Sequence, residues 1–148
     1  MIFTVVNVFK HFKGLRHDMT YHIPSDELVI RAIRRIFRKY RSVTSQHRLK
    51  ILIDRELNTK EKIFRVTGVR LRKLIITHNL ATVEIHSREG DPRKVLTRCP
   101  VCNHSLNRVK NQTIWGGEVT LEFRCGRCSY WTGKKKRIPT RYIFYSKK

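Results

Sequence analysis

Two short cysteine motifs, Cys99-Pro-Val-Cys102 and Cys125-Gly-Arg-Cys128, decide how the last third of this 148-residue chain folds. Each motif can place two thiolates on one tight turn, and twenty-two residues separate the two motifs. Together the turns offer four sulfur ligands at tetrahedral positions, which is the closed ligand set of a structural zinc site. We therefore predict one structural Zn²⁺ bound by Cys99, Cys102, Cys125 and Cys128, with no coordination position open for catalysis.

Two other uses of paired cysteines fit this chain less well. Two disulfides are typical of secreted proteins, and the sequence shows no secretory signal. A redox-active pair would be expected at the strand–helix junction of a thioredoxin-like unit. We therefore expect a reducing, intracellular and cytoplasmic location. His104 lies two residues after Cys102, but four well-spaced thiols leave it no position as a ligand, so we expect it on the surface.

Short extended segments surround the two motifs. Leu106–Val109 and Gln112–Trp115 read as strand pieces, and Gly116-Gly117 is a two-residue hairpin signal. Glu118–Arg124 alternates into the second motif, and Ser129–Gly133 predicts a third strand. This pattern resembles the zinc ribbons of ribosomal proteins, of archaeal and eukaryotic transcription factors and of RNA polymerase subunits. The resemblance implies a role in nucleic-acid machinery and nothing narrower.

The part of the chain before residue 97 predicts helices. Ser25 is a typical N-cap for a helix over 26–41, and Thr44 or Ser45 for a second helix over 45–57. Thr67 begins a third helix that ends at His78, where Asn79 favours a left-handed stop. Apolar side chains at three- and four-residue steps give the inward faces: Val29, Ala32, Ile33, Ile36, Phe37 and Tyr40; Leu49, Leu52, Ile53 and Leu57; Val69, Leu71, Leu74 and Ile75.

Strands flank these helices. Residues 2–9 are rich in β-branched and aromatic side chains, Leu80–Arg88 alternates, and a turn at 89–92 leads into a short basic strand, Arg93–Leu96. Three helices followed by a β-hairpin resemble a winged helix-turn-helix domain over residues 25–97. We therefore predict an α+β fold: a three-helix, winged-helix-like domain with a β-hairpin at 1–96, then a small all-β zinc ribbon with a basic aromatic tail at 97–148. We expect the two modules to lie close together, with a common strand running from one into the other.

Positive charge is the dominant feature of the composition. The chain has 33 Lys and Arg against 11 Asp and Glu, a net charge of +22, and both predicted modules carry it. Such self-repulsion is expected of a protein with a polyanionic partner, and nucleic acid is the first candidate. An anionic membrane is the second, but the sequence has no apolar run that could span one and no basic amphipathic terminal helix. A hydrophobic content of 40% is sufficient for a folded core.

The basic residues that we expect to contact nucleic acid fall into four groups. On the first helix they form one stripe with no acid beyond the first turn, and the winged-helix resemblance implies that the third helix presents its cations to a groove. In the ribbon and tail, cations alternate with aromatic rings that can stack on unpaired bases. The candidates are Arg31, Arg34, Arg35 and Arg38 on the first helix; Arg70, Arg72 and Lys73 on the third; Arg93 and Lys94 on the wing; and Arg124, Arg127, Lys134, Lys135, Lys136, Arg137 and Arg141 in the ribbon and tail.

The sequence favours binding over catalysis. It contains no phosphate-cradling glycine motif, no nucleophile elbow and no His-Glu metal helix, so we expect neither an enzyme nor a small-molecule substrate. Charge spread over both modules favours a protein that docks on RNA within a large ribonucleoprotein, most plausibly the ribosome. The alternative is a DNA-binding winged-helix transcription regulator that reads a groove with 67–78 and uses the ribbon to contact a partner. An archaeal source would suit either arrangement.

Overall fold

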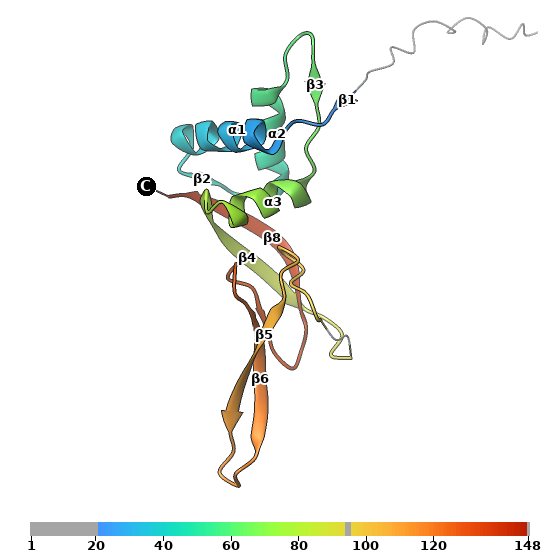
Figure 1. The fold of residues 1–148 in the computed structure, drawn as a ribbon, viewed down its shortest axis with the longest axis vertical. Coiled ribbons are helices and arrows are strands. Elements are labelled where there is room, and N and C mark those ends of the chain that lie inside the picture. The colour runs from blue at the N-terminus through green and yellow to red at the C-terminus, as the bar shows by residue number, and fades with distance from the viewer. Residues whose placement is uncertain (1–20, 94–95, 148) are drawn as a thin grey trace, which may run out of the picture.

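The computed structural model describes residues 21–93 and 96–147 and shows an elongated molecule with its helices at one end and a long hairpin at the other (Figure 1). The helices are α1 (Asp26–Lys39), α2 (Gln46–Leu57) and α3 (Gly68–Thr77). Their N-caps are Ser25, Ser45 and Thr67, whose hydroxyls accept hydrogen bonds from Leu28, Arg48 and Arg70 backbone N–H groups. The predicted caps are therefore confirmed, while the expected strand at 2–9 lies outside the described residues.

The three helices enclose one apolar core together with the C-terminal strand. Val29, Ile33, Leu49, Ile53, Leu71, Ile75 and Phe144 are fully buried in it. Two expected members are exposed instead. Tyr40 is the residue that caps the end of α1, so the helical periodicity no longer directs it inward. Val69 lies four residues before exposed Lys73, on the outer side of α3, and is 50% exposed.

An antiparallel sheet lies beneath the helices. Its strand order is β2 (Ser42–Val43), β8 (Arg137–Ser146) and β4 (Ala81–Glu89). The strand that pairs with β4 among the described residues is β8, from Ala81 opposite Ser146 to Glu89 opposite Arg137, and not the segment directly after the turn at 89–92. Of the strand expected at 93–96, Arg93 lies in a turn, Leu96 lies outside any strand, and the two residues between them lie outside the described residues. β8 also places Phe144 in the helical core.

A second antiparallel sheet lies, in chain order, between β4 and β8. It contains β5 (Leu106–Gln112), β6 (Glu118–Cys125) and β7 (Trp131–Thr132), in that order across the sheet. Gly116, at a φ of +81°, lies in the turn between β5 and β6, but that turn is a loop over 113–117 and not the predicted two-residue turn, because the extended segment ends at Gln112 and not at Trp115. The hairpin projects away from the helices, and its tip exposes Ile114 and Trp115 almost completely (Figure 1).

A short parallel pair, β1 (Tyr21–His22) and β3 (Ile63–Phe64), completes the described fold. The guanidinium of Arg65 lies 3.6 Å from the centroid of the Tyr21 ring beside this pair. The chain is thus an α+β protein with three helices and several sheets among its described residues. None of these helices is both long and apolar enough to cross a membrane.

Candidate metal centre and basic surfaces

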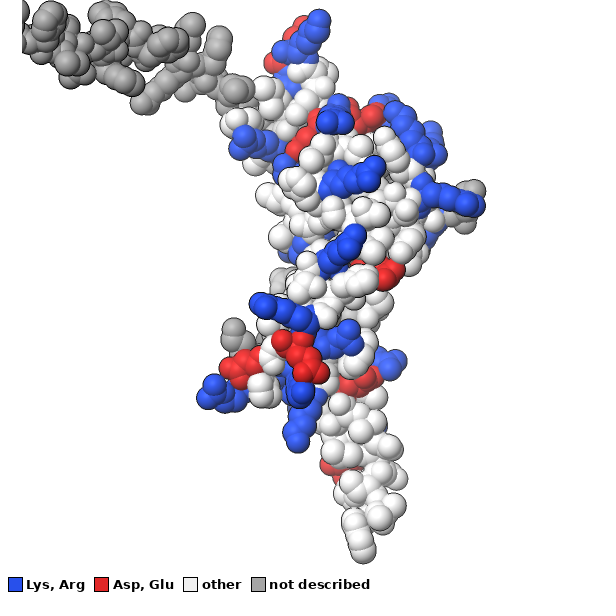
Figure 2. All heavy atoms as spheres, turned by 180° about the vertical axis from the view of Figure 1, so that it is seen from behind, with Lys and Arg blue, Asp and Glu red and all other residues white. Residues whose placement is uncertain are grey.

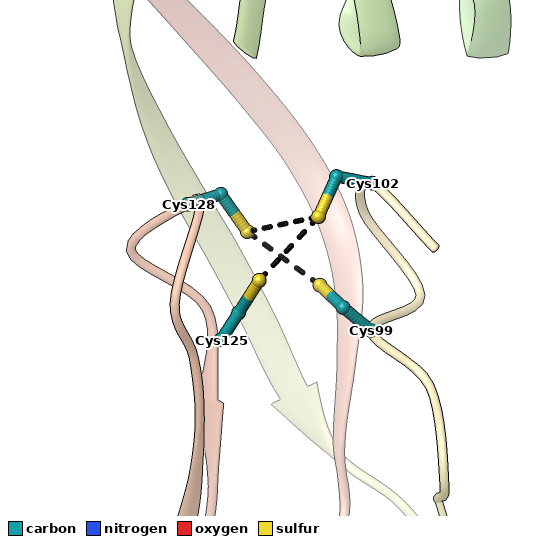
Figure 3. A group of neighbouring side chains, drawn as sticks. All are labelled: Cys99, Cys102, Cys125 and Cys128. Atoms are coloured by element: carbon teal, nitrogen blue, oxygen red, sulfur yellow. Dashed lines mark hydrogen bonds between the residues drawn. The ribbon is translucent and has the colours of Figure 1, made fainter. Parts of the chain in front are cut away.

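The four cysteine sulfurs meet between the two predicted turns. All four Sγ atoms lie within 4.8 Å of one another (Figure 3). The Sγ of Cys99 is 3.5 Å from that of Cys128, and the Sγ of Cys102 is 3.4 Å from Cys125 and 3.8 Å from Cys128. The structure therefore assembles the set of four thiols that the spacing of the two motifs predicts.

The donor set fits a structural zinc ion. A tetrahedron with metal–sulfur distances of about 2.3 Å has sulfur–sulfur edges of about 3.8 Å, close to the separations found here. Cys99 and Cys125 are buried, and Cys102 and Cys128 are half-buried, so solvent has limited access to the sulfurs. The four cysteines are therefore positioned to bind one metal ion. Bonds from that ion to the thiolates would join the two turns.

Electrostatics within the cluster also favour a bound cation. The contact with Cys128 lowers the pKa of Cys99 to about 5, while burial raises the pKa of Cys102 to about 11. The same contact with Cys99 raises the pKa of Cys128. Because one thiolate disfavours ionisation of its neighbours, all four sulfurs can be ionised together only when a positive charge lies among them.

Backbone hydrogen bonds shape both turns. The Cys99 N–H donates to the His104 carbonyl at 2.8 Å, and Asn103 adopts a φ of 64°, which closes the first turn. In the second turn the Cys125 N–H donates to the Tyr130 carbonyl at 2.9 Å, and the Arg127 N–H points at the Cys125 sulfur at 3.5 Å. His104 is half-buried and contributes its carbonyl, not its ring, to this region.

The metal centre is packed into the junction between the two sheets. Val101 and Tyr130 are buried beside the cysteines and form a second apolar core. Side chains from three elements of the helical part pack against that core: Ile76 of α3, Ile85 of β4 and Tyr142 of β8. The cysteine turns are thus packed directly against the helical part.

Arg72 connects the third helix to the metal centre. It was expected on the exposed side of the helix, but only 8% of it is exposed. Its guanidinium donates to the Val101 carbonyl at 3.4 Å and to Gln46 Oε1 of α2, and it stacks on the Tyr142 ring at 4.4 Å. The expectation fails because α3 is covered on two sides, by the helical core and by the first cysteine turn.

The other cations predicted on α3 differ in their surroundings. Arg70 is half-buried; its Nε donates to Asp26 Oδ1 at 3.0 Å and its guanidinium also donates to the Pro24 carbonyl at 2.7 Å. It therefore ties the start of α3 to the start of α1. Lys73 is exposed, on the outer side of the helix with Val69 and Thr77. Of the three predicted cations, Lys73 alone is fully available to a ligand.

The stripe predicted on the first helix is present. Arg31, Arg34, Arg35 and Arg38 are all exposed on the outer face of α1. Arg35 donates to Glu56 of α2 at 3.1 Å. The other three form no ion pair with a carboxylate of the described residues, so α1 presents a row of available guanidinium groups.

The remaining predicted cations lie in the ribbon, the connecting loops and β8. Arg93, Arg124, Arg127, Lys134, Lys135 and Arg141 are exposed, Lys136 and Arg137 are half-buried, and Lys94 lies outside the described residues. Carboxylates pair with three of them: Asp91 with Arg93, Glu122 with Arg124 and Glu89 with Lys135. From behind, basic side chains are spread over the helical end and the middle of the molecule, whereas this face of the distal hairpin shows few charged side chains (Figure 2).

The aromatic rings of the C-terminal part divide between core and surface. Tyr130 is buried and Phe123 is half-buried, whereas Trp131 is 42% exposed. Phe144 is fully buried because β8 enters the helical core, so this ring is not available to a base. The alternation of Tyr142, Phe144 and Ser146 along one side of the tail was a signal that this segment forms a strand.

The fold and the site define the protein as an α+β chain with four cysteines positioned to bind a metal ion. Comparison with known proteins matched no family model, no curated protein and no solved structure.

Proposed function

We propose that this protein is a non-catalytic RNA-binding component or associated factor of a large ribonucleoprotein, with the ribosome as the first candidate. The observation that carries the proposal is the distribution of available cations. Arg31, Arg34 and Arg38 line the helical end, while Lys134 and Arg127 lie on the opposite module, and none of these five forms an ion pair among the described residues. A protein surrounded by phosphates needs positive charge on several faces, because each phosphate that it neutralises adds to affinity.

The metal centre supports a structural role for zinc in this function. All four ligands are protein thiols, so a bound zinc ion has no position left for substrate or activated water. The centre instead fixes the two cysteine turns against Ile76, Ile85 and Tyr142, and thereby sets the ribbon relative to the helices. We propose that this arrangement presents two basic surfaces, α1 and the ribbon, in one rigid relation.

We also propose that the helical part is a winged helix-turn-helix domain. In this domain the ribbon is inserted between the two strands of the wing. The element order α1, β2, α2, α3, β4, β8 and the sheet order β2-β8-β4 support this interpretation. In it, β4 and β8 are the wing strands, and the segment between Glu89 and Arg137 replaces the short wing loop. This topology is the observation that favours the second candidate function, a DNA-binding transcription regulator.

The surroundings of α3 weigh against DNA reading. A recognition helix needs several side chains free to reach base edges. Here Arg72 is buried, Arg70 is engaged by Asp26 and Pro24, and Lys73 is left with the neutral neighbours Val69 and Thr77. RNA docking through distributed cations does not require that helix to be free.

The first test is the sedimentation of the tagged protein from its own cells through a sucrose gradient at moderate salt, with and without RNase. The proposal expects migration with ribosomal particles that collapses after RNase treatment. Migration at the top of the gradient, or with chromatin and indifferent to RNase, would overturn it in favour of the DNA candidate. Purified protein then distinguishes the two directly, by its affinity at matched salt for single-stranded RNA and for duplex DNA of equal length.

A further inference from the structure

A cavity of about 390 Å³ opens where β4 ends and β8 begins, on the side facing β7. Ser87, Arg88 and Glu89 line it from β4, and Trp131, Gly133, Lys135 and Arg137 line it from the ribbon end and the start of β8. Its volume lies within the usual range for small-ligand sites, about 300–1,000 Å³. The cavity is separate from the metal centre, since none of the four cysteines lines it.

One wall of the cavity is a preformed stack of an aromatic ring and a guanidinium. Arg137 Cζ lies 4.1 Å from the centroid of the Trp131 ring, and both side chains line the cavity. Backbone contacts hold this arrangement: the Arg137 N–H donates to Thr132 Oγ1 at 3.0 Å, and the buried Tyr130 hydroxyl donates to the Arg137 carbonyl at 2.5 Å. A planar base can therefore continue the stack without ordering a mobile side chain first.

The remaining walls supply the polar groups that a nucleotide requires. Arg88, which forms no ion pair among the described residues, brings positive charge for a phosphate, whereas Lys135 is paired with Glu89. Glu89 accepts a hydrogen bond from Lys135 at 2.8 Å, and its carboxylate retains acceptor capacity for an exocyclic amino group of a base. Stacking, phosphate binding and an acceptor are thus present in one cavity.

We propose that this cavity binds one unpaired nucleotide of a single-stranded RNA segment, with the base on the Trp131–Arg137 stack and a phosphate at Arg88. The proposal rests on the proposed RNA-binding function and specifies where single-stranded RNA is held. A base-paired nucleotide does not fit this role, because its neighbours in the duplex cover both faces of the base.

The chain offers a matched control for the test. Its two tryptophans are Trp115 and Trp131, and Trp115 lies 91% exposed at the tip of the hairpin, remote from the cavity. Nearby Lys110 is paired with Glu118 at 2.6 Å, so the tip lacks the surplus of cations found around Trp131. Both rings are exposed, and replacement of either leaves the two cores intact.

The experiment measures affinity of the full zinc-loaded chain for a single-stranded RNA decamer and for duplex RNA. Trp131→Ala should weaken binding of the decamer about 5- to 150-fold, the range expected when one base stack is removed, and leave duplex binding unchanged. Trp131→Phe should restore most of the affinity, and Trp115→Ala should bind both RNAs as the unchanged protein does. Equal decamer affinity of Trp131→Ala and the unchanged protein, or an equal weakening with duplex, would overturn the proposal.

A direct readout comes from fluorescence. In the Trp115→Phe variant Trp131 is the single tryptophan, and the decamer should change its emission, whereas inorganic polyphosphate, which has no bases, should not. An identical response to both would contradict base stacking at this position. RNA binding without any change in Trp131 emission would refute nucleotide binding in the cavity but not the proposed function. If the unchanged protein does not bind RNA at all, both proposals are refuted.

Discussion

Arg72 is a buried cation whose surroundings include no carboxylate contact within the described part of the chain. Burial of an unpaired charge is costly, so the guanidinium needs compensation from other groups. Its hydrogen bonds to Val101 and Gln46 and its stack on Tyr142 provide part of it. A divalent zinc ion with four thiolates carries a net negative charge. Val101 lies in the turn that supplies two of these thiolates, so its contact with Arg72 brings the guanidinium close to the metal centre. We infer that Arg72 also balances the charge of the metal centre.

Replacement of Arg72 tests this role. Arg72→Met should lower the free energy of unfolding by about 2–4 kcal/mol, because two acceptors are deprived of a charged donor. It should also weaken zinc binding, measured by competition with a chromophoric chelator. The neighbouring Lys73→Met, at an exposed position, should change stability by no more than about 0.5 kcal/mol. Similar melting temperatures and zinc affinities for the two variants would contradict the role assigned to Arg72.

At the scale of elements, the sheet of β5, β6 and β7 with its two cysteine turns, which we propose to be a zinc ribbon, is too small to fold on its apolar surface alone. Its core within the module consists of a few residues, Val101 and Tyr130 together with the cysteines. Structural zinc contributes about 10–16 kcal/mol in small peptides, as much as the whole stability of a typical domain, about 5–15 kcal/mol. The helical core is different, since α1, α2, α3 and Phe144 build it without any contribution from the metal ligands.

We therefore expect removal of zinc to unfold the ribbon before the helices. Cys125→Ser should abolish stoichiometric zinc binding, lower the melting temperature and remove the amide protection of β5–β7, while the helical circular dichroism signal persists at room temperature. Hydrogen exchange followed by mass spectrometry resolves the two regions. The control is Ser105→Ala, which removes an exposed hydroxyl next to the first turn and leaves all four thiols in place. Full zinc retention by Cys125→Ser would refute the four-thiol centre.

For the whole molecule, available and paired cations have different expected effects on binding. Arg31, Arg34 and Arg38 have no carboxylate partners in the described residues, whereas Lys50, Lys110 and Arg124 are each paired within their own element or sheet. A cation releases counterions from a phosphate only if it is free to reach that phosphate. Because each set contains three cations, replacing either set lowers the net charge by the same amount. A difference in RNA binding between the two variants therefore reports direct phosphate contact and not net charge.

The prediction concerns the salt dependence of RNA binding. Replacing Arg31, Arg34 and Arg38 by Gln should reduce the slope of log affinity against log salt concentration by roughly 2, at about 0.7 for each phosphate of single-stranded RNA that is no longer neutralised. The same replacement of Lys50, Lys110 and Arg124 should alter the slope much less. Filter binding at salt concentrations between about 50 and 200 mM gives both slopes, because phosphate-dependent affinities change steeply over that range. Equal slopes for the two triple variants would exclude α1 as an RNA-contacting surface.

Much of the fold is local, and the sequence by itself determined it. The three helix starts at Ser25, Ser45 and Thr67, the left-handed stop at Asn79 and each of the two Cys-x-x-Cys turns depend on interactions within about four residues. A cap or a Cys-x-x-Cys turn has the same geometry in almost any surroundings. The pattern of the residues is therefore sufficient to predict them.

Only the tertiary structure decided which strands pair and which polar residues are buried. Glu89 pairs with Arg137 across the whole inserted ribbon, and that choice depends on the length of β8 and on the space for Phe144 in the helical core. Arg72 is buried because the first cysteine turn packs on a side of α3 that periodicity alone leaves exposed. Helical periodicity identifies one buried face, but a second packing partner brought from a distant part of the chain can bury another.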